Sequence, residues 1–367
     1  MKPQKLSLVF KKFDWLLLIT VCLIVILGLI LLYSIALGSQ SEQSLLNFKK
    51  QAVFFICGLF IIFFIAFFID YKVLIKYNAV LYALGVCLLV AVLFLGRTIR
   101  GTAGWIELFG WSFQPVELAK ICLIIYLSKF LSDKAKYISQ LKYLILSSLG
   151  AFLLVLLVFL QPDFGSAIIL FALWLALVLI TGIKKSHLFS LAVILVISSL
   201  VLWFFVFQDF QKERVRVFLN PELDPLGSGY NITQAMIAIG SGKVFGKGLA
   251  FGSQSQLKFL PESQTDFIFA VLAEELGFAG ICLLFILFGF LFYRLIKIAK
   301  EAHSNFAAYL AVSILILFFI QLAINIGGNL GLLPITGITL PFLSYGGSSL
   351  IVNMVLVGVV ESIAVRN

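Results

Sequence analysis

Long apolar runs separated by short polar segments make up almost the whole chain. A helix that crosses a bilayer needs about 20 mostly apolar residues, and the runs have about that length. No clear repeat and no second domain interrupts the pattern, so we expect residues 1–367 to form one all-α polytopic membrane domain. The pattern predicts ten membrane-spanning helices, at residues 14–37, 48–69, 76–95, 115–132, 142–160, 164–183, 187–207, 267–293, 306–326 and 347–364.

The composition agrees with a membrane protein and excludes a soluble globule, because 62% of the residues are hydrophobic and only 12% are charged. The formal net charge of +10 could suggest a nucleic-acid partner. However, the Lys and Arg residues lie mostly in short loops on alternate sides of the predicted membrane, which is the signal of membrane topology. It predicts that both termini are cytoplasmic, and it argues against nucleic-acid binding.

The predicted topology places the unusual sequence in the outer loops, at residues 38–47, 96–114, 161–163, 208–265 and 327–346. In the longest loop, between helices seven and eight, residues 209–219 and 230–239 have helical patterns that suit short interfacial helices. Four predicted helices begin at the outer face, so their N-terminal N–H groups point outward. Such helix ends around one vestibule would suit an anionic ligand.

An acid-rich stretch, KFLPESQTDFIFAVLAEELG, ends this long loop and enters the eighth predicted helix. Carboxylates at membrane depth are energetically costly and by default mark a functional site. Asp266 could simply stabilise the helix N-terminus by its negative charge, with Thr265 as the N-cap. Four acids in one stretch are more than capping needs, so we expect Asp266 to lie near the chemistry.

A second charged group lies in QPVELAKI, where Pro115 is favoured in the first turn of a helix. Glu117 and Lys120 are three residues apart and share one helix face. They could form a buried ion pair between helices, or Lys120 could bind a phosphate. Glu274 is predicted at a similar depth, so Lys120 could bridge both acids. Asp163, which follows Gln161-Pro162, is predicted to be a helix N-cap, with ligand or metal binding as the alternative.

The outer loops carry further candidates for binding. Trp105 could be an aromatic-belt residue or a surface on which a sugar stacks. The last outer loop is uncharged and rich in Gly and Pro, so it could line a cavity within the membrane. Ser344 and Ser348 have no His nearby in the sequence, which argues against a serine hydrolase. The outer-face cations could together hold phosphate groups: Arg214, Arg216, Lys243, Lys247 and Lys258.

Five segments together resemble the SEDS family (shape, elongation, division and sporulation proteins): QPVELAK, QPDFGSAI, DPLGSGYNITQAMIAIGSG, FLPESQTDFIFAVLAEELG and GITLPFLSYGGSSL. The resemblance covers essentially the whole chain. It implies a ten-helix peptidoglycan glycosyltransferase that polymerises lipid II at the outer face of the bacterial cytoplasmic membrane. It also implies a class B penicillin-binding protein as partner, within an elongation or division complex. The segment IGSGKVFGKGLAFGSQSQLKFLPE is more similar to the elongation polymerases of the family than to its division polymerases.

The resemblance also implies roles for single residues. Asp266 matches the essential aspartate of the family, and it would accept the proton of the acceptor hydroxyl. Glu117 and Lys120 match a buried ion pair, Asp163 matches the acid of the QPD motif, and Trp105 matches the tryptophan of an outer loop. No tightly bound cofactor is expected. Cationic side chains and helix N-termini, with or without a divalent cation (Mg²⁺ or Mn²⁺), would stabilise the departing pyrophosphate.

One departure from the family pattern concerns the residue before this tryptophan, where relatives often have Arg and this chain has Gly104. The missing cation puts an anion-binding role for this loop in doubt, although Arg100 could substitute.

Two other functions suit parts of the same pattern. A lipid II transporter would also use a bundle with buried charges, but transport needs binding groups at both faces, and the unusual sequence lies at one. A scaffold for a partner synthase would leave the acid cluster without a purpose. The sequence therefore favours an enzyme that acts at the outer face.

Overall fold

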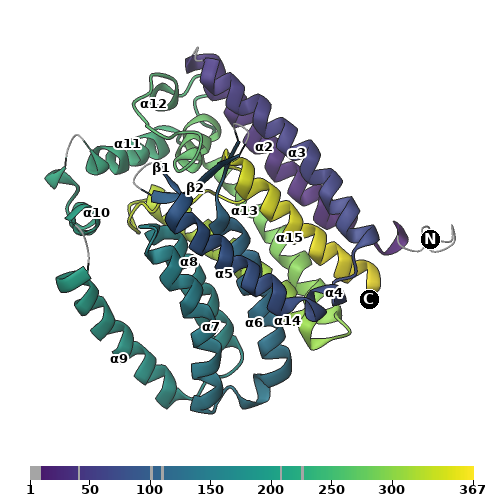
Figure 1. Ribbon diagram of the computed structural model, residues 1–367. Coiled ribbons are helices and arrows are strands. Elements are labelled where there is room, and N and C mark those ends of the chain that lie inside the picture. Colours follow the sequence, from purple (N-terminus) through teal and green to yellow (C-terminus); the bar gives the residue numbers. More distant parts are fainter. Residues whose placement is uncertain (1–9, 40–41, 100–101, 109–110, 207–208, 225–226) are drawn as a thin grey trace.

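A computed structural model describes residues 10–39, 42–99, 102–108, 111–206, 209–224 and 227–367 (Figure 1). Within these residues the fold is a bundle of long apolar helices, as predicted. Eight helices are long and apolar enough to cross a membrane. They are α2 (Trp15–Ser39), α3 (Glu42–Phe68), α5 (Asn78–Leu95), α7 (Leu141–Phe159), α9 (Lys185–Val201) together with the helical residues that continue it to Phe205, α13 (Ile268–Glu301), α14 (Asn305–Asn329) and α15 (Gly347–Arg366).

The two remaining predicted spans are also helices, α6 (Pro115–Lys134) and α8 (Phe164–Ile180). Charged side chains such as Glu117 and Lys120 lower the hydropathy of α6. With 17 residues, α8 is about 25 Å long, slightly less than the hydrocarbon thickness of a bilayer. Each of the ten predicted spans therefore corresponds to a helix of the structure.

The sequence prediction was wrong at several helix ends. Helix α3 begins at Glu42, six residues before the predicted start at 48, and α13 continues to Glu301 rather than ending at 293. Helix α9 ends at Val201, and the chain continues as a π-helix, η2 (Leu202–Val206). The short α4 (Lys72–Lys76) and η1 (Ala135–Tyr137) lie in loops.

The all-α prediction missed a small antiparallel sheet in the loop between α5 and α6. Its strands are β1 (Arg97–Ile99), β2 (Thr102–Leu108) and β3 (Trp111–Phe113), in the order β1-β2-β3. Strands of three to seven residues give a weak sequence signal, because backbone pairing between neighbouring strands carries most of the pattern.

Close helix packing forms the core around α3 and α15, which lie side by side. A Cβ atom added at Gly58 would come within 2.6 Å of Met354, and one at Gly358 within 3.2 Å of the Ile62 backbone. Small residues at such crossings let helix backbones approach closely, which is how membrane helices associate without a hydrophobic driving force. Helix α2 packs against α3 and α13, and α14 packs against α13, α6 and α8.

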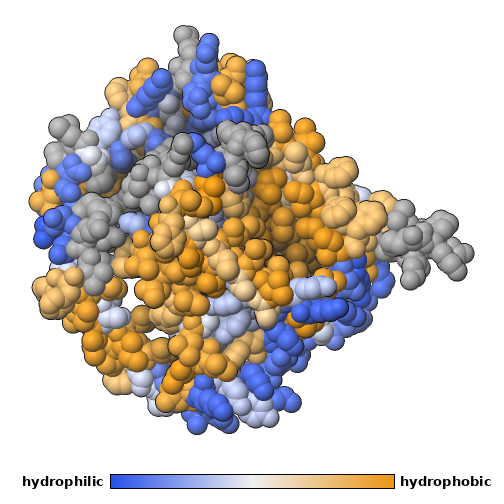
Figure 2. Space-filling view, viewed as in Figure 1, coloured by the Kyte–Doolittle hydropathy of each residue, from blue (hydrophilic) through white to orange (hydrophobic). Residues whose placement is uncertain are grey.

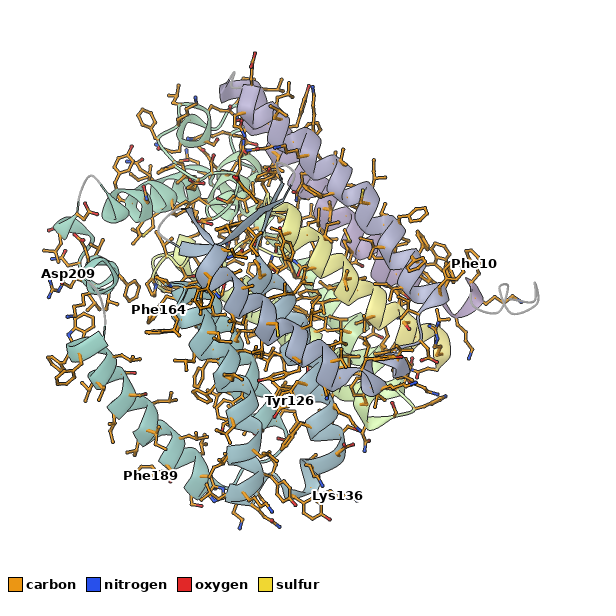
Figure 3. All side chains as sticks on the ribbon, viewed as in Figure 1. Phe10, Tyr126, Lys136, Phe164, Phe189 and Asp209 are labelled. Atoms are coloured by element: carbon orange, nitrogen blue, oxygen red, sulfur yellow. The ribbon has the colours of Figure 1, made fainter. Side chains whose placement is uncertain are left out.

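Helix α9 stands apart from the bundle (Figure 1). None of its residues is buried, and the space-filling view shows a gap on this side of the molecule (Figure 2). The side chains of α9, including Phe189, project without a helix neighbour on most sides (Figure 3). A helix that is apolar all round and unburied by protein is suited to lipid on nearly every face.

The long loop after α9 contains the two helices that the sequence predicts, α10 (Asp209–Leu219) and α11 (Ser228–Ser241). It also contains η3 (Pro221–Leu223) and α12 (Ser253–Gln256). Helix α11 packs against α13 and α14. In Figure 3, Asp209 lies at the left edge of the molecule and Lys136 near its lower end.

Candidate active site

Asp266 is half-buried in a run of turns, residues 261–267, that leads into α13. It borders a small pocket that α14 and the segment after it complete. Three different parts of the chain thus meet at this residue. The other residues that line the pocket are Phe267, Ile324, Asn325, Gly328, Asn329, Ile335, Thr336, Gly337 and Ile338.

The prediction that Thr265 caps this helix was wrong. Helix α13 begins at Ile268, and its N-cap residue, Phe267, has no side chain that could accept a hydrogen bond. The Thr265 hydroxyl instead donates to the Glu262 carbonyl at 3.3 Å. The cap comes from another helix, because the Ala270 N–H donates to the Asn329 Oδ1 atom at 3.2 Å.

Ser344 is buried, and its hydroxyl makes structural hydrogen bonds to the backbone rather than contacting a catalytic base. Its hydroxyl donates to the Thr265 carbonyl at 2.7 Å and accepts the Leu340 N–H at 2.9 Å. The neighbouring Tyr345 N–H donates to the Gln264 carbonyl at 2.8 Å. Burial raises the pKa of the Tyr345 hydroxyl, so this side chain stays neutral. Ser348 is half-buried in the first turn of α15.

Glu117 and Lys120 form the predicted ion pair, with Nζ 2.7 Å from Oε1 and both side chains buried. The prediction that Lys120 could bridge to Glu274 was wrong. Glu274 instead pairs with Lys247 at 2.8 Å and accepts the backbone N–H groups of Gln254 and Ser255. These donors come from the long outer loop, which folds over α13, so Glu274 has its partners without Lys120.

The long outer loop covers a break in α13 at Gly277, where φ is 66° and ψ is −161°. The break frees backbone groups on both sides of it, and the loop residues satisfy them. The Lys247 and Gly248 N–H groups donate to the carbonyls of residues 274 and 275, at 2.9 and 3.0 Å. In return, the N–H groups of residues 278 and 279 donate to the Lys243 and Val244 carbonyls. This break was not predicted from the sequence. The signal that could have indicated it is Gly277 within a helical pattern, together with the Gly-rich loop that covers it.

Glu275 anchors the same loop to α2. Its carboxylate accepts the Ser34 hydroxyl at 2.6 Å and the Gln256 amide at 3.1 Å, and Ser34 also accepts the Ala250 N–H. Broken helices that place backbone and polar groups at membrane depth are typical of proteins that bind polar substrates there. The half-helix that follows Asp266 is therefore held by buried acids at its far end.

Asp163 is the N-cap of α8, as predicted, because it accepts the Ser166 N–H at 3.0 Å. It also accepts the Gln114 side-chain amide at 3.1 Å, which ties the start of α8 to the start of α6. A Cβ atom added at Gly165 would lie 2.4 Å from the Thr336 carbonyl. The first turn of α8 therefore touches the segment that lines the Asp266 pocket.

Most of the predicted outer-face cations lie at the protein surface. Arg216, Lys243 and Lys258 are exposed. Arg214 lies in α10, but its side chain is outside the part of the chain that the structure describes, and Arg100 lies outside it altogether. Lys247 is the exception, since it is paired with Glu274.

Trp105 is half-buried on β2. A Cβ atom added at the preceding residue, Gly104, would lie 3.5 Å from Gln161. The sheet therefore covers the turn that leads into α8.

Within the described residues, no three His, Cys, Asp or Glu side chains are close enough together to hold a metal ion.

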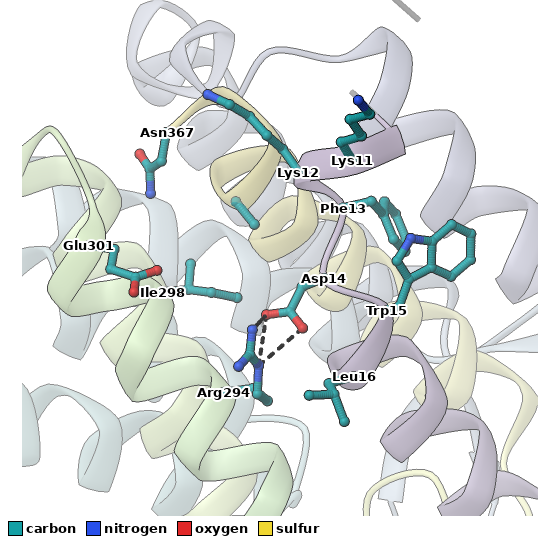
Figure 4. A pocket seen from close by; sticks show the side chains of 11 residues that line it. Lys11, Lys12, Phe13, Asp14, Trp15, Leu16, Arg294, Ile298, Glu301 and Asn367 are labelled. Atoms are coloured by element: carbon teal, nitrogen blue, oxygen red, sulfur yellow. Dashed lines mark hydrogen bonds and ion pairs between the residues drawn. The ribbon is translucent and has the colours of Figure 1, made fainter. Parts of the chain in front are cut away.

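A second group of buried charges lies at the other end of α13 (Figure 4). Arg294 donates from Nε to both carboxylate oxygens of Asp14, at 3.0 and 2.9 Å, and the Asp14 N–H donates to Glu361 at 3.0 Å. These residues tie α2, α13 and α15 together beside a cavity of about 340 Å³. Sequence reasoning missed this cluster, because Asp14 and Arg294 are 280 residues apart.

Fold and site together define a class: a polytopic membrane protein with a half-buried aspartate at the start of a broken helix. Residues 14–367 match the family profile described as "cell cycle protein" and named for FtsW, RodA and SpoVE. The chain belongs to this family, also known as SEDS.

Relatives from both branches of the family match almost the whole chain. The peptidoglycan glycosyltransferase MrdB of Escherichia coli is 39% identical over 342 residues, which cover 93% of this chain and 92% of MrdB. A probable peptidoglycan glycosyltransferase FtsW of Coxiella burnetii is 37% identical and covers 98% of both chains.

Two solved structures share the fold. A chain from a peptidoglycan synthase complex, described as coordinating polymerization and crosslinking, superposes with a TM-score of 0.81 at 31% identity and covers 96% of this chain and 97% of its own length. The rod shape determining protein RodA of Thermus thermophilus gives a TM-score of 0.70 at 29% identity and covers 96% of both chains. The fold is thus that of a solved family member.

Proposed function

We propose that this chain polymerises lipid II at the outer face of the bacterial cytoplasmic membrane, with Asp266 as the general base. Family membership makes the chain a peptidoglycan glycosyltransferase, and its curated relatives carry that name. The observation that carries the proposal is the position of Asp266, a half-buried carboxylate beside a pocket, at the entrance to a broken helix. We also propose the orientation that follows from the Lys and Arg pattern, with both termini cytoplasmic.

In the proposed reaction, the 4-hydroxyl of one lipid II sugar attacks the anomeric carbon of a growing glycan. Asp266 takes the hydroxyl proton, directly or through a water molecule, as the new C–O bond forms. The bond from the anomeric carbon to undecaprenyl pyrophosphate breaks, and the pyrophosphate leaves with the electron pair. Attack opposite the leaving group inverts the anomeric carbon and gives a β-1,4 link. Outer-loop cations and the outward helix N-termini would stabilise the leaving group.

The separation of α9 from the bundle supports a lipid-linked substrate. The sugar and pyrophosphate of lipid II are polar, but the undecaprenyl chain must remain in hydrocarbon while the head group reacts. A helix with no buried residue, beside an opening in the molecular surface, would let such a chain reach the site from the bilayer.

We propose that the chain is an elongation polymerase rather than a division polymerase, and that it works with a class B penicillin-binding protein. The segment from residue 239 to residue 262 supports the elongation branch by its sequence. The likeness to a chain of a synthase complex supports a crosslinking partner. The sequence identities to MrdB (39%) and to FtsW (37%) are too similar to each other to decide between the elongation and division branches.

We propose that any divalent cation in the reaction arrives with the pyrophosphate, because the described residues do not assemble three ligands of their own. In that case Mg²⁺ or Mn²⁺ would supply positive charge to the leaving group. Chelation by EDTA, followed by readdition of Mg²⁺, tests this proposal by the amount of glycan formed. Polymerisation that is unchanged by EDTA would contradict it.

The purified chain, reconstituted with its class B partner and supplied with lipid II, tests the main proposal. Wild type should give glycan ladders on a gel, and Asp266→Asn should give none while keeping its thermal unfolding temperature. Glu262→Gln is the matched control, since Glu262 lies in the same turn but is exposed, and it should retain activity. Full activity of Asp266→Asn would refute the assignment. Movement of lipid II between liposome leaflets without ladders would instead identify a transporter.

A further inference from the structure

We infer that Asn325 and Asn329 of α14 are positioning residues for the reaction: they hold the backbone of Asp266 and so fix where its carboxylate lies. This inference rests on the proposed function, because it requires Asp266 to act as the base. The two amides do not touch the substrate in this account. They act through the residue that does.

Both amides donate to the same atom. The Asn325 Nδ2 group lies 3.0 Å from the main-chain carbonyl oxygen of Asp266, and the Asn329 Nδ2 group lies 2.8 Å from it. The two residues are four apart and therefore share one face of α14. A carbonyl oxygen has two lone pairs, so these two bonds use its full accepting capacity.

The remaining groups of the two amides hold the surroundings of Asp266. Asn325 also donates to the Ile338 carbonyl at 2.8 Å, and Ile338 lines the pocket. Asn329 also donates to the Asn325 carbonyl at 2.9 Å, and its Oδ1 atom accepts the Ala270 N–H at 3.2 Å. One pair of side chains therefore fixes the carboxylate-bearing residue, the first turn of α13 and one wall of the pocket relative to each other.

The main-chain carbonyls of the two residues before Asp266 also accept hydrogen bonds. Tyr345 N–H donates to the Gln264 carbonyl at 2.8 Å, and the Ser344 hydroxyl donates to the Thr265 carbonyl at 2.7 Å. Three consecutive carbonyls of the turn thus each accept a hydrogen bond from a distant part of the chain. The turn precedes α13, so helical hydrogen bonds do not fix these peptide units.

Burial makes these contacts strong enough to position a side chain. The exposed fractions of Asn325 and Asn329 are 4% and 2%. In such surroundings an unmade hydrogen bond costs more than in water, so rotation of the Asp266 peptide away from the amides is unfavourable. Polar side chains within a membrane helix are costly, and a role in positioning Asp266 accounts for two of them on one face.

The test replaces each asparagine by leucine, whose side chain has the same number of heavy atoms and the same branching, and which suits a membrane helix. Asn353→Leu in α15 is the matched control, because Asn353 is equally buried and neither polar atom of its side chain has a hydrogen-bond partner within the described structure. A displacement of a catalytic group by about 1 Å can cost roughly 100-fold in rate. Asn325→Leu and Asn329→Leu should therefore lower kcat for lipid II polymerisation by about 10- to 100-fold. KM should change less than about twofold, because both amides are almost fully buried and already bonded to backbone carbonyls. Asn329→Gln, which keeps the amide, should recover part of kcat.

A second measurement does not depend on activity. In an Asp266→Cys background from which the five native cysteines have been removed, the rate of thiol alkylation by iodoacetamide reports how well residue 266 is held. Adding Asn329→Leu should change this rate several-fold, whereas adding Asn353→Leu should not. This arm remains informative if a leucine variant is too unstable for kinetic assays.

The outcomes separate this inference from the proposed function. Wild-type kcat in both leucine variants, or an unchanged alkylation rate, overturns the positioning role while wild-type ladders still support the polymerase. A fall in kcat no larger than in Asn353→Leu overturns it too. Absence of ladders from the wild type refutes the proposed function, and the role of the amides with it.

Discussion

Replacement of Lys120 by methionine tests whether the Glu117–Lys120 pair is structural. The two side chains are buried, with exposed fractions of 2% for Lys120 and 6% for Glu117, and their charged atoms are 2.7 Å apart. The second carboxylate oxygen of Glu117 has no hydrogen-bond partner within the described structure. Lys120→Met would therefore leave a buried carboxylate without its cation.

The size of the effect follows from this burial. Removing one partner of a buried ion pair costs about 3–5 kcal/mol, because the remaining charge is left without a partner. Replacing both partners by apolar side chains of similar volume is often neutral or stabilising. We therefore expect Lys120→Met to lower the free energy of unfolding by about 3–5 kcal/mol, and Glu117→Leu/Lys120→Met to recover most of that loss.

Reversible unfolding in mixed detergent micelles, followed by circular dichroism, measures these differences. Lys129→Met is the control on the same helix, since Lys129 pairs with Asp133 at 2.9 Å but both side chains are a third to a half exposed. Such an exposed pair contributes about 1 kcal/mol or less. Equal losses in Lys120→Met and Lys129→Met, or a double variant no more stable than Lys120→Met, would refute the reasoning.

The double variant also separates the two roles that the sequence leaves open for Lys120. If the pair is only structural, the stable double variant should polymerise lipid II at close to the wild-type rate. If Lys120 binds a phosphate of the substrate, the double variant should fold but lose activity, mainly through a higher KM.

Three further predictions concern the broken helix and the helix caps. Gly277→Ala should lower the free energy of unfolding by roughly 1–3 kcal/mol, because φ is 66° and a Cβ atom would lie 2.2 Å from the Gly246 nitrogen. Gly289→Ala on the same helix is the control and should show no loss of thermal stability, because its Cβ atom would meet open space. Glu274→Gln should speed tryptic cleavage of the outer loop after Lys258 several-fold, because the ion pair between Glu274 and the loop residue Lys247 is lost. Cleavage at the wild-type rate would show that Glu274 does not anchor the loop. Asp163→Ala should lower the free energy of unfolding by about 0.5–2 kcal/mol through loss of the N-cap, whereas Asp163→Asn should retain most of it; equal losses in both variants would argue for a role of the negative charge itself.

Much of the fold could be predicted because it depends on local composition. An apolar run of about 20 residues has few stable alternatives to a helix in lipid, since every backbone group must be satisfied within the segment. Pro115 and Asp163 likewise mark helix starts by their own chemistry, and the structure confirms both. The ion pair of Glu117 and Lys120 could be predicted for the same reason, because a helix places residues three apart on one face.

The sequence also indicated Asp266 as the candidate base, from the cost of acids at membrane depth and from a family resemblance that the comparisons confirm. The catalytic role itself stays a prediction. The family is decided by long motifs, and motif residues can be recognised without knowing what they contact.

Partners that are distant in the chain could not be predicted. The sequence suggested Lys120 as a partner for Glu274, but the loop residue Lys247 takes that place, because the break at Gly277 lets the outer loop fold onto α13. Asp14 with Arg294, and Asn329 with the first turn of α13, join residues whose separation along the chain carries no local signal.

The division between the two kinds of information has one physical reason. Hydrophobicity, charge and helix periodicity are properties of neighbouring residues, so the sequence by itself determined the number of long apolar helices and their approximate ends. Hydrogen bonds and buried ion pairs depend on distances of about 3 Å between groups from different helices. Only the tertiary structure decided that α14 and the segment after it hold the turn that carries Asp266.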